Sequence, residues 1–382
     1  MDNNWDQLKN RIVGVKGLTA IAFSDIVGNA ISMFFWFYIA TAIEPERYGE
    51  IHYFLGIAGI ASYISLVGTL NTITVYTAKK IQIQSTLYLI SLIIGAISSL
   101  IVIGVFYRID VVIVLIAYVI NTLAIGDLLG RRAYLDYSKY VLTQKILTVV
   151  LGIGFYYLFG VDGILFALAL SYIFYTIQIY NGLRSSKISF SLLKPRVGFI
   201  LNNYVMVLLM GVEGQIDKLI IAPTFGFSVL GNYSLAYQII TMMLIFSQIM
   251  FKYLLSQDAS GIKNTKIKKT VIFIAIGISL AGIILSPMII PKFFSKYLEV
   301  TYAVQIMSFA AVPQTISMIF SSRLLGLEKS KFVLINYIIS ISVYGGGIFI
   351  LGSFLSIVGL AIAFLASSTV SAIFMFFVDK KQ

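Results

Sequence analysis

The chain has 382 residues, of which 59% are apolar and 12% are charged. A soluble domain typically has about a quarter of its residues charged, so this composition excludes a soluble globular protein. With no cysteine and one histidine, His52, the chain cannot form a disulfide framework or a zinc site of the usual ligand spacing. The net charge of +12 could indicate a nucleic-acid partner. In a membrane protein, however, excess Lys and Arg are first expected in the cytoplasmic loops.

Apolar runs separated by charged residues predict an all-α integral membrane protein. A span needs roughly 20 apolar residues, so twelve spans leave only short connectors and no extramembrane domain. The predicted spans are 18–42, 51–76, 85–107, 111–129, 141–160, 163–182, 199–222, 231–255, 270–290, 303–325, 331–351 and 357–378.

The basic residues give these spans an orientation. Alternate connectors and both termini place 22 of the 28 Lys and Arg residues on one side, and four on the other. Because Lys and Arg concentrate in cytoplasmic loops, we expect a multi-pass protein of the cytoplasmic membrane with both termini in the cytoplasm. This distribution explains the positive charge without a nucleic-acid partner.

The two halves of the chain resemble each other at a separation of 196 residues. Leu128-Leu129-Gly130 ends the fourth predicted span and Leu324-Leu325-Gly326 ends the tenth. Gly163, Ala167 and Ser171 open the sixth span, and Gly359, Ala363 and Ser367 open the twelfth. The alternative is that small residues simply recur in membrane helices. A duplication predicts two six-helix lobes related as parallel repeats, 1–182 and 199–382, joined by a cytoplasmic linker, 183–198.

Polar residues form faces on the first two predicted helices. A charge within hydrocarbon costs at least about 2.5 to 3.5 kcal/mol, so such a residue marks a candidate site. Asp25 lies roughly 10 Å into its span at about 1.5 Å per residue, and Asn29 and Ser32 share its face. The second helix carries a stripe of hydroxyl side chains, which either lines a shared aqueous surface or makes hydrogen bonds between helices: Ser62, Ser65, Thr69 and Thr72.

A second polar group falls on the seventh and eighth predicted helices. Glu213 lies roughly 21 Å into its span and must face protein or a cavity. Asp217 shares its face near the outer boundary, where interfacial solvation is an adequate alternative, and Tyr237 and Thr241 share a face of the next helix. We treat Asp25 and Glu213 as candidate site residues and the remaining polar residues as cavity lining.

Two charged residues receive structural interpretations. Lys145 lies four residues into its span and is expected to extend its ammonium group to the interface. Asp127 is expected to pair with Arg131 one helical turn later.

The sequence carries no phosphate-binding glycine loop, no zinc-protease helix motif and no Ser/His/Asp set. Membrane polymerases and glycosyltransferases usually need a sizeable extramembrane loop, which the short predicted connectors do not provide. The chain is therefore not expected to be an enzyme, and no cofactor is expected.

Four short segments resemble Wzx-type oligosaccharide (O-antigen) flippases. The segment Ile43–Gly49 is similar to their Leu-Gly-Pro-Glu-x-Tyr-Gly signature, and the segments Asp217–Ile221 and Leu230–Tyr237 are similar to their helix 7 to 8 passage. The segment Val358–Ala363 resembles their helix 12 entry. Each match is short, but together they span nearly the whole chain in order.

This resemblance implies membership of the superfamily that also contains MATE exporters and peptidoglycan lipid-precursor flippases. It implies a V-shaped pair of six-helix lobes around a cavity lined by helices 1, 2, 7 and 8. The implied activity is to move a polyprenyl-linked oligosaccharide to the outer leaflet by alternating access, with an H⁺ or Na⁺ gradient. The partners would be the lipid-linked oligosaccharide, membrane lipid and the glycan polymerase or glycosyltransferase machinery.

One departure from the family keeps other functions open. Many relatives have Arg where Thr41 stands, and the intramembrane charges here are mostly acidic. Acidic groups fit cation coupling at Asp25 and Glu213, which we take as the candidate coupling residues, and they also fit a MATE-like exporter of small organic cations. A third hypothesis is a membrane scaffold that recruits glycan-assembly enzymes without transporting anything.

Overall fold

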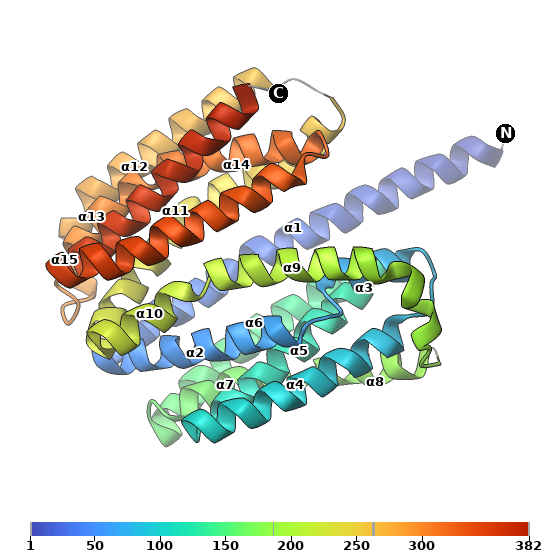
Figure 1. Cartoon of the computed structure of the whole chain (residues 1–382), viewed down its shortest axis with the longest axis horizontal. Coiled ribbons are helices and arrows are strands. Elements are labelled where there is room, and N and C mark those ends of the chain that lie inside the picture. Colours follow the sequence, from blue (N-terminus) through green and yellow to red (C-terminus); the bar gives the residue numbers. More distant parts are fainter. Residues whose placement is uncertain (1, 186, 262–263, 381–382) are drawn as a thin grey trace. The chain divides into compact units, whose positions relative to one another are not determined.

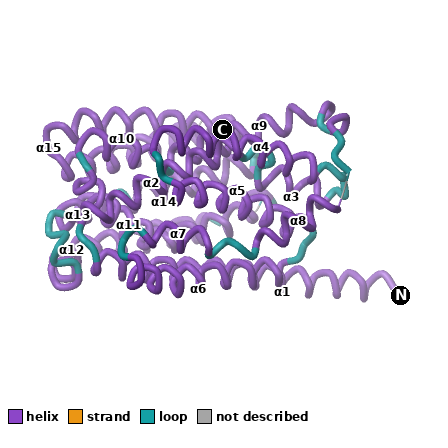
Figure 2. Tube along the Cα trace, turned by 90° about the horizontal axis from the view of Figure 1, so that it is seen from below, coloured by secondary structure: helices purple, strands orange, loops and turns teal. Residues whose placement is uncertain are grey.

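The computed structural model describes residues 2–185, 187–261 and 264–380, and these ranges contain helices and loops but no strand (Figure 2). The chain folds into two compact units. Unit 1 comprises residues 1–36 and 57–211, and unit 2 comprises residues 37–56 and 212–382. The predicted lobe boundaries at 182 and 199 stay a prediction.

Nine α-helices run through the first part of the chain (Figure 1), and the first, second and ninth of them cross from one unit to the other. They are α1 (Asp2–Ala42), α2 (Pro45–Ser65), α3 (Leu70–Ala78), α4 (Gln84–Phe106), α5 (Ile109–Gly130), α6 (Tyr134–Phe159), α7 (Gly163–Leu170), α8 (Tyr175–Ser185) and α9 (Val197–Glu213). Two short 3₁₀ turns, Phe190–Leu192 and Lys194–Arg196, precede α9. In unit 1, α5 packs against α3, α4, α7 and α8, which explains why Val111, Val114 and Leu115 are fully buried.

Unit 2 contains the remaining helices. They are α10 (Ile216–Phe225), α11 (Phe227–Ala259), α12 (Thr265–Phe293), α13 (Val300–Phe309), α14 (Ala311–Gly326) and α15 (Ser330–Lys380). Helix α14 packs against α11 and α15, and α13 packs against α11, α12 and α15. The apolar outer faces of these helices keep residues such as Phe273, Met288 and Phe354 exposed, as expected for helices that face lipid.

Eight of the described helices are long and apolar enough to cross a membrane, or up to ten if each of two bent pairs is one span. The bent pairs are α2 with α3, at 41°, and α7 with α8, at 44°. Helix α15 covers both of the last two predicted spans, which meet at the non-helical Ser356 (φ 49°). The count of twelve spans stays a prediction, as does the orientation, which also counts Lys263 and Lys381 outside the described residues.

The predicted single helix over 51–76 is wrong in two respects. Helix α2 begins at Pro45 because proline fits the first turn of a helix, where its missing N–H costs nothing. The helix then ends at Ser65, and Thr69 starts α3 as its N-cap by accepting a hydrogen bond from the Thr72 N–H. The polar stripe of Ser62, Ser65, Thr69 and Thr72 was predicted for one continuous helix, but a break between α2 and α3 divides it.

The ends of α5 and α14 have the same geometry 196 residues apart. Arg132 and Glu328 both adopt a left-handed conformation, with φ of 59° and 60°. The N–H of Ala133 donates to Leu128 O at 2.9 Å, and the N–H of Lys329 donates to Leu324 O at 2.8 Å. Each helix thus ends in the same Schellman turn, which satisfies the last carbonyl groups.

Side-chain contacts in the two units repeat with the same separation. Ser171 accepts a hydrogen bond from Gln144 at 3.1 Å in unit 1, and Ser367 interacts with Ser340 at 3.0 Å in unit 2. A Cβ atom on Gly163 would lie 2.8 Å from Phe155 O, and one on Gly359 would lie 1.9 Å from Leu351 O. Three independent local contacts in the same register support the duplication over the chance recurrence of small residues.

The Gly359 contact gives a stability prediction. Gly359→Ala places a methyl group against the Leu351 carbonyl across the Ser356 kink, and such overpacking costs about 1–3 kcal/mol. The control is Gly346→Ala on the same helix, where nothing lies within 4 Å of the added atom. Unfolding by denaturing detergent in mixed micelles measures both variants. Equal stability of the two would contradict the close approach at Gly359.

Candidate functional site

Asp25 lies in the part of α1 that belongs to unit 1, and its neighbours come from α6. The Tyr137 hydroxyl donates a hydrogen bond to the Asp25 carboxylate at 2.7 Å. Lys145 is close enough for the Asp25 charge to act on its ammonium group. The carboxylate therefore has a hydroxyl donor and a nearby cation within the same unit, which lowers the cost of placing its charge in an apolar span.

Lys145 packs against α1. Its Cγ atom lies 3.2 Å and its Cε atom 3.9 Å from the position that a Cβ atom on Gly28 would occupy. The side chain thus runs along α1 one turn from Asp25, and the expected extension of its ammonium group to the interface stays a prediction. The glycine allows this approach because it has no side chain.

The other predicted polar residues of unit 1 differ in exposure. Asn29 is exposed and Ser32 is partly buried, so both remain compatible with a solvated face of α1. The stripe residues Ser62, Ser65, Thr69 and Thr72 are at most 3% exposed. Their hydroxyl groups bond within unit 1: Ser62 to Gly59 O, Ser65 to Ala61 O and to Ser98 of α4, and Thr69 to Thr72. These contacts correspond to hydrogen bonding between and within helices, and a cavity-lining role for the four stays a prediction.

Unit 2 brings together Glu213, Asp217 and Tyr237, which the sequence placed on two helices. Glu213 is the last residue of α9, and Ser340 of α15 is its hydrogen-bonding neighbour. The carboxylate charges of Glu213 and Asp217 both act on the Tyr237 hydroxyl, and that of Glu213 also acts on Tyr337. Thr241, one turn further along α11, is exposed and donates to Tyr237 O. Glu213, Asp217 and Tyr237 thus lie near one another within unit 2, whereas Thr241 bonds only to its own helix.

Lys218 holds the break between α9 and α10 together. Its Nζ atom donates to Gln215 Oε1 at 2.9 Å and to Gly214 O at 3.2 Å, and it lies 3.6 Å from Asp217 Oδ1. The ammonium therefore satisfies a carbonyl group that the interrupted helix leaves unpaired. Asp217 is 2% exposed, so interfacial solvation does not explain its charge and the ion pair with Lys218 does.

Several residues of these clusters were not predicted. Tyr137, Tyr337 and Ser340 look like ordinary membrane-helix residues in sequence, since tyrosine and serine are frequent throughout the chain. One signal was available for Ser340, because it lies 196 residues after Gln144 and repeats the contact that Gln144 makes. Tyr233 and Tyr344, which share a hydrogen bond between their hydroxyl groups, were also missed.

The segment that carries the Pro-Glu-x-Tyr-Gly resemblance makes a reciprocal contact within unit 2. A Cβ atom on Gly49 of α2 would lie 1.9 Å from Phe227 O of α11, and one on Gly231 of α11 would lie 1.7 Å from Pro45 O of α2. Phe227 is four residues before Gly231, as Pro45 is before Gly49, so equivalent first turns of two helices meet backbone to backbone. We call this contact the glycine seam.

Polar contacts flank the glycine seam. Lys296 Nζ lies 3.0 Å from the Glu44 carboxylate, and the Tyr297 hydroxyl donates to Ile43 O at 3.3 Å. Tyr48 and Tyr297 are fully buried and their rings lie 6.0 Å apart, edge to face. The connection between α1 and α2 is thereby held on the loop that follows α12.

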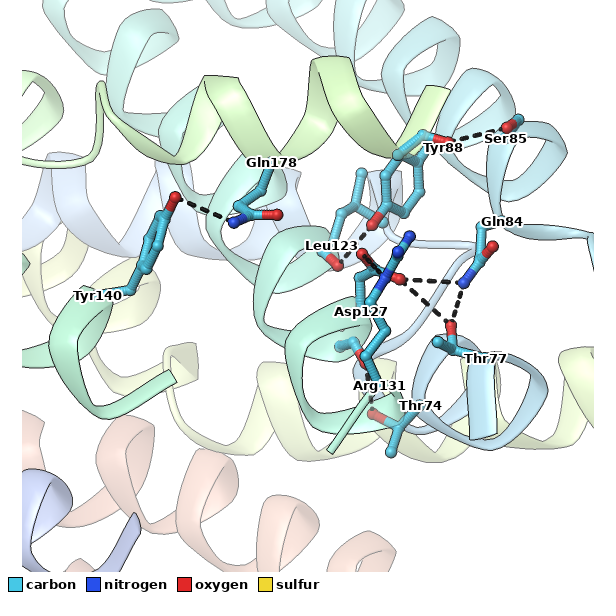
Figure 3. Close-up of polar contacts among 12 residues, drawn as sticks. Thr74, Thr77, Gln84, Ser85, Tyr88, Leu123, Asp127, Arg131, Tyr140 and Gln178 are labelled. Atoms are coloured by element: carbon cyan, nitrogen blue, oxygen red, sulfur yellow. Dashed lines mark hydrogen bonds and ion pairs between the residues drawn. The ribbon is translucent and has the colours of Figure 1, made fainter. Parts of the chain in front are cut away.

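Unit 1 also contains a polar network around Asp127, shown in Figure 3. Arg131 Nε donates to Asp127 Oδ2 at 2.8 Å, which confirms the predicted structural pair. Gln84 Nε2 donates to Asp127 Oδ1 at 3.0 Å and to the Thr77 hydroxyl at 2.5 Å. The network ties α3, α4 and α5 together at one end of the unit.

The sequence matches no family model and no curated protein. The structure, in contrast, matches solved transporters over nearly the whole chain. An inward-facing multidrug resistance MATE family transporter of the MOP superfamily has a TM-score of 0.71 at 17% identity, covering 93% of both chains. The lipid II flippase MurJ in an inward closed conformation has a TM-score of 0.75 at 12% identity, covering 94% of this chain and 87% of that one.

A third structure is a MOP superfamily transporter from Pyrococcus furiosus whose binding pocket is described as having reversed polarity, with a TM-score of 0.65 at 17% identity. It covers 96% of this chain and 95% of that chain. The chain has the fold of the MATE/MOP superfamily transporters. At these identities the likeness concerns the fold alone, and these neighbours are transporters or flippases, not enzymes.

The Lys218 contacts give a second prediction. Lys218→Met leaves the buried Asp217 carboxylate without its ammonium partner and Gly214 O without its donor. Breaking a buried pair in this way costs about 3–5 kcal/mol. Lys139→Met is the matched control, because Lys139 and its partner Asp136 are 77% and 57% exposed, and an exposed pair is worth at most about 1 kcal/mol.

Detergent-induced unfolding of both variants measures the difference. Adding Asp217→Asn to Lys218→Met should recover part of the loss, because it removes the charge left unpaired. A Lys218→Met protein as stable as the Lys139→Met protein would show that the pair does not hold the break.

Proposed function

We propose that the chain moves a polyprenyl-linked oligosaccharide across the cytoplasmic membrane by alternating access, driven by a cation gradient. The observation that carries the proposal is the glycine seam. The segment resembling the oligosaccharide-flippase signature supplies half of it, and the segment resembling the helix 7 to 8 passage supplies the other half. The two signature segments thus act on each other, in a chain with the transporter fold.

Alternating access gives the seam a role. A transporter that opens to each side in turn needs a contact at each end that forms in one state and breaks in the other. Glycine pairs permit tight backbone packing with few side-chain contacts to separate, and the Glu44–Lys296 pair is solvent-accessible. The α1–α2 connection is therefore the part of unit 2 that we expect to detach when the outer side opens.

Asp25 and Glu213 are the proposed cation-coupling groups. Both carboxylates lie in apolar helices, one in each unit. In this proposal the polar faces of α1 and of the unit 2 cluster pass the glycan head group, while the polyprenyl tail stays in the bilayer. The glycan polymerase or glycosyltransferase machinery would supply the substrate or consume the product.

The direct test is reconstitution into liposomes with a fluorescently labelled polyprenyl-linked sugar and an imposed ion gradient. We expect gradient-dependent movement of the sugar to the other leaflet, which a scaffold would not produce. Glu213→Gln is expected to lower the initial rate at least about tenfold, since it removes a coupling charge worth more than about 1.4 kcal/mol, and Asp25→Asn is expected to lower it as well.

Asp136→Asn is the matched control, because this carboxylate is exposed and pairs only with an exposed lysine. It should transport at the wild-type rate. Full gradient-driven transport by both the Asp25→Asn and the Glu213→Gln protein would refute the coupling role.

A cross-linking experiment tests the glycine seam. The chain has no cysteine, so Glu44→Cys with Lys296→Cys creates the only thiol pair. Joining the two thiols with a short, reducible bifunctional thiosulfonate should abolish transport, because the outer side cannot open while the α1–α2 connection is held. Reduction of the cross-link should restore transport. Each single variant, treated with the same reagent, is the control. Unchanged transport in the cross-linked protein would show that the seam is not a gate.

One observation favours a second candidate, a MATE-like exporter of small organic cations. The candidate cluster of unit 2 carries two carboxylates, Glu213 and Asp217, and one lysine, which suits a positively charged substrate. A deletion strain separates the two functions. Loss of surface glycan with unchanged drug sensitivity supports the flippase, whereas altered drug sensitivity with intact glycan supports the exporter.

A further inference from the structure

The segment between α8 and α9 combines four basic residues with an absence of acidic ones. The basic residues are Arg184, Lys187, Lys194 and Arg196. The sequence has no Asp or Glu from Gly163 to Val212, so no acidic residue close in sequence balances these charges. An orientation signal explains basic residues in a connector that is predicted to be cytoplasmic, and it requires nothing else of the segment.

The same segment also exposes two large apolar side chains. Ser189 is extended, with φ −142° and ψ 102°. In extended backbone, successive side chains point to opposite sides, so those of Ile188 and Phe190 point away from the side that Ser189 faces. Ile188 is 51% exposed and Phe190 is 60% exposed. The orientation rule concerns charge alone, so these two apolar side chains need a different explanation.

Contacts with α4 determine which way the segment faces. The Ser189 N–H donates to the Thr86 hydroxyl at 2.9 Å, and the Ser85 hydroxyl donates to Gly182 O at 3.0 Å. Ser85 and Thr86 are fully buried, and all four residues belong to unit 1. Ser189 therefore faces the body of unit 1, and its two apolar neighbours are held on the outer side, where α8 ends and α9 begins (Figure 1).

The two arginines have neighbours that orient them without balancing their charge. The Arg184 guanidinium lies 4.4 Å from the centre of the Tyr180 ring. Arg196 donates to Leu192 O at 2.6 Å and lies 5.8 Å from the centre of the Tyr76 ring. An aromatic ring and a carbonyl group carry no net charge, so the positive charge of both arginines is available to an anion.

Another basic connector of unit 1 lacks the apolar component. Lys79 and Lys80 follow α3 and are exposed, but Ile83, three residues later, is fully buried. Exposed apolar side chains thus do not accompany every group of basic residues in this unit. The combination of both is specific to the segment between α8 and α9.

We propose that this segment binds anionic phospholipid at the membrane surface. Its basic groups contact the lipid phosphates, and its two apolar side chains enter the region between the head groups and the acyl chains. We call the residues concerned the lipid patch: Arg184, Lys187, Ile188, Phe190, Lys194 and Arg196. This inference does not rest on the proposed transport of a sugar.

The surface on either side of the lipid patch favours lipid over a protein partner. Ile177 on α8 and Leu201 on α9 are exposed apolar residues within predicted membrane spans. The exposed apolar surface therefore continues from the lipid patch onto helices that the bilayer covers. An acidic protein would match the charge of the patch, but it would have to leave this continuous apolar surface at the membrane.

Tryptophan fluorescence tests the proposal with the full-length protein. Phe190→Trp places the fluorophore in the lipid patch, and the signal of the native Trp5 and Trp36 is subtracted with the wild-type protein. The protein is reconstituted into phosphatidylcholine vesicles that contain a small, equal share of either brominated phosphatidylglycerol or brominated phosphatidylcholine. Bromine quenches tryptophan at short range. We expect both lipids to quench the introduced tryptophan, and the anionic lipid to quench it more strongly.

Paired lysine variants identify the residues that select the anionic lipid. Lys187→Gln with Lys194→Gln should reduce the preference for phosphatidylglycerol at least about fivefold, since each basic residue near an anionic surface contributes roughly that factor. Lys79→Gln with Lys80→Gln is the matched control, because it removes the same charge from the connector whose isoleucine is buried, and it should leave the preference unchanged. Gel filtration confirms that each variant is folded. Ile188→Trp carries the fluorophore if Phe190→Trp does not fold.

Three results would overturn the inference. Quenching by neither lipid would place the lipid patch outside the bilayer and leave a protein as its occupant. Equal quenching by the two lipids would show insertion without selection for an anion. Equal loss of the preference in both lysine pairs would show a general attraction of basic residues to the membrane. Because no lipid-linked sugar is present, each result leaves the flippase function to be decided by the transport assay.

Discussion

The fold depends on one constraint, which is that a charge in an apolar span is costly unless a partner lies beside it. The partners are local in this protein: Lys218 follows Asp217 directly, Arg131 lies one turn after Asp127, and Arg108 precedes Asp110 by two residues. In these three pairs the partners are at most four residues apart, so each pair is set by the local geometry of one helix and its ends.

The duplication is visible in the backbone of the two units. Both units end a central helix with the same Schellman turn and pack the same small residues 196 positions apart. The residues that match between the halves are small residues in packing contacts and at helix ends, whereas the charged residues differ. Lys145 has no counterpart 196 residues later, where Ile341 stands, and Ser340 occupies the position equivalent to Gln144. A shared scaffold with diverged polar groups allows the two units to have different roles.

Sequence periodicity predicted the all-helical membrane fold and the repeat register, because both depend on local apolar patterning. It failed at 51–76, because the break after Ser65 results from side chains of α4, with Ser91 accepting the Gly68 N–H at 2.9 Å. Glu213 and Asp217 were expected on one face of a single helix over 199–222. The helix breaks at Gly214 and Gln215, so the two residues lie on α9 and α10, and their neighbours on α11 and α15 depend on tertiary packing.

The glycine seam and the Glu213 cluster are connected by α2 and α10. Lys218 Cβ lies 3.1 Å from the position that a Cβ atom on Gly56 would occupy, and Gly56 is seven residues after Gly49 on the same helix. Seven residues are nearly two helical turns, so Gly49 and Gly56 lie on one face of α2. That face therefore touches α11 at the seam and the lysine that holds the α9–α10 break. One face of α2 therefore links the seam and the α9–α10 break by contiguous packing.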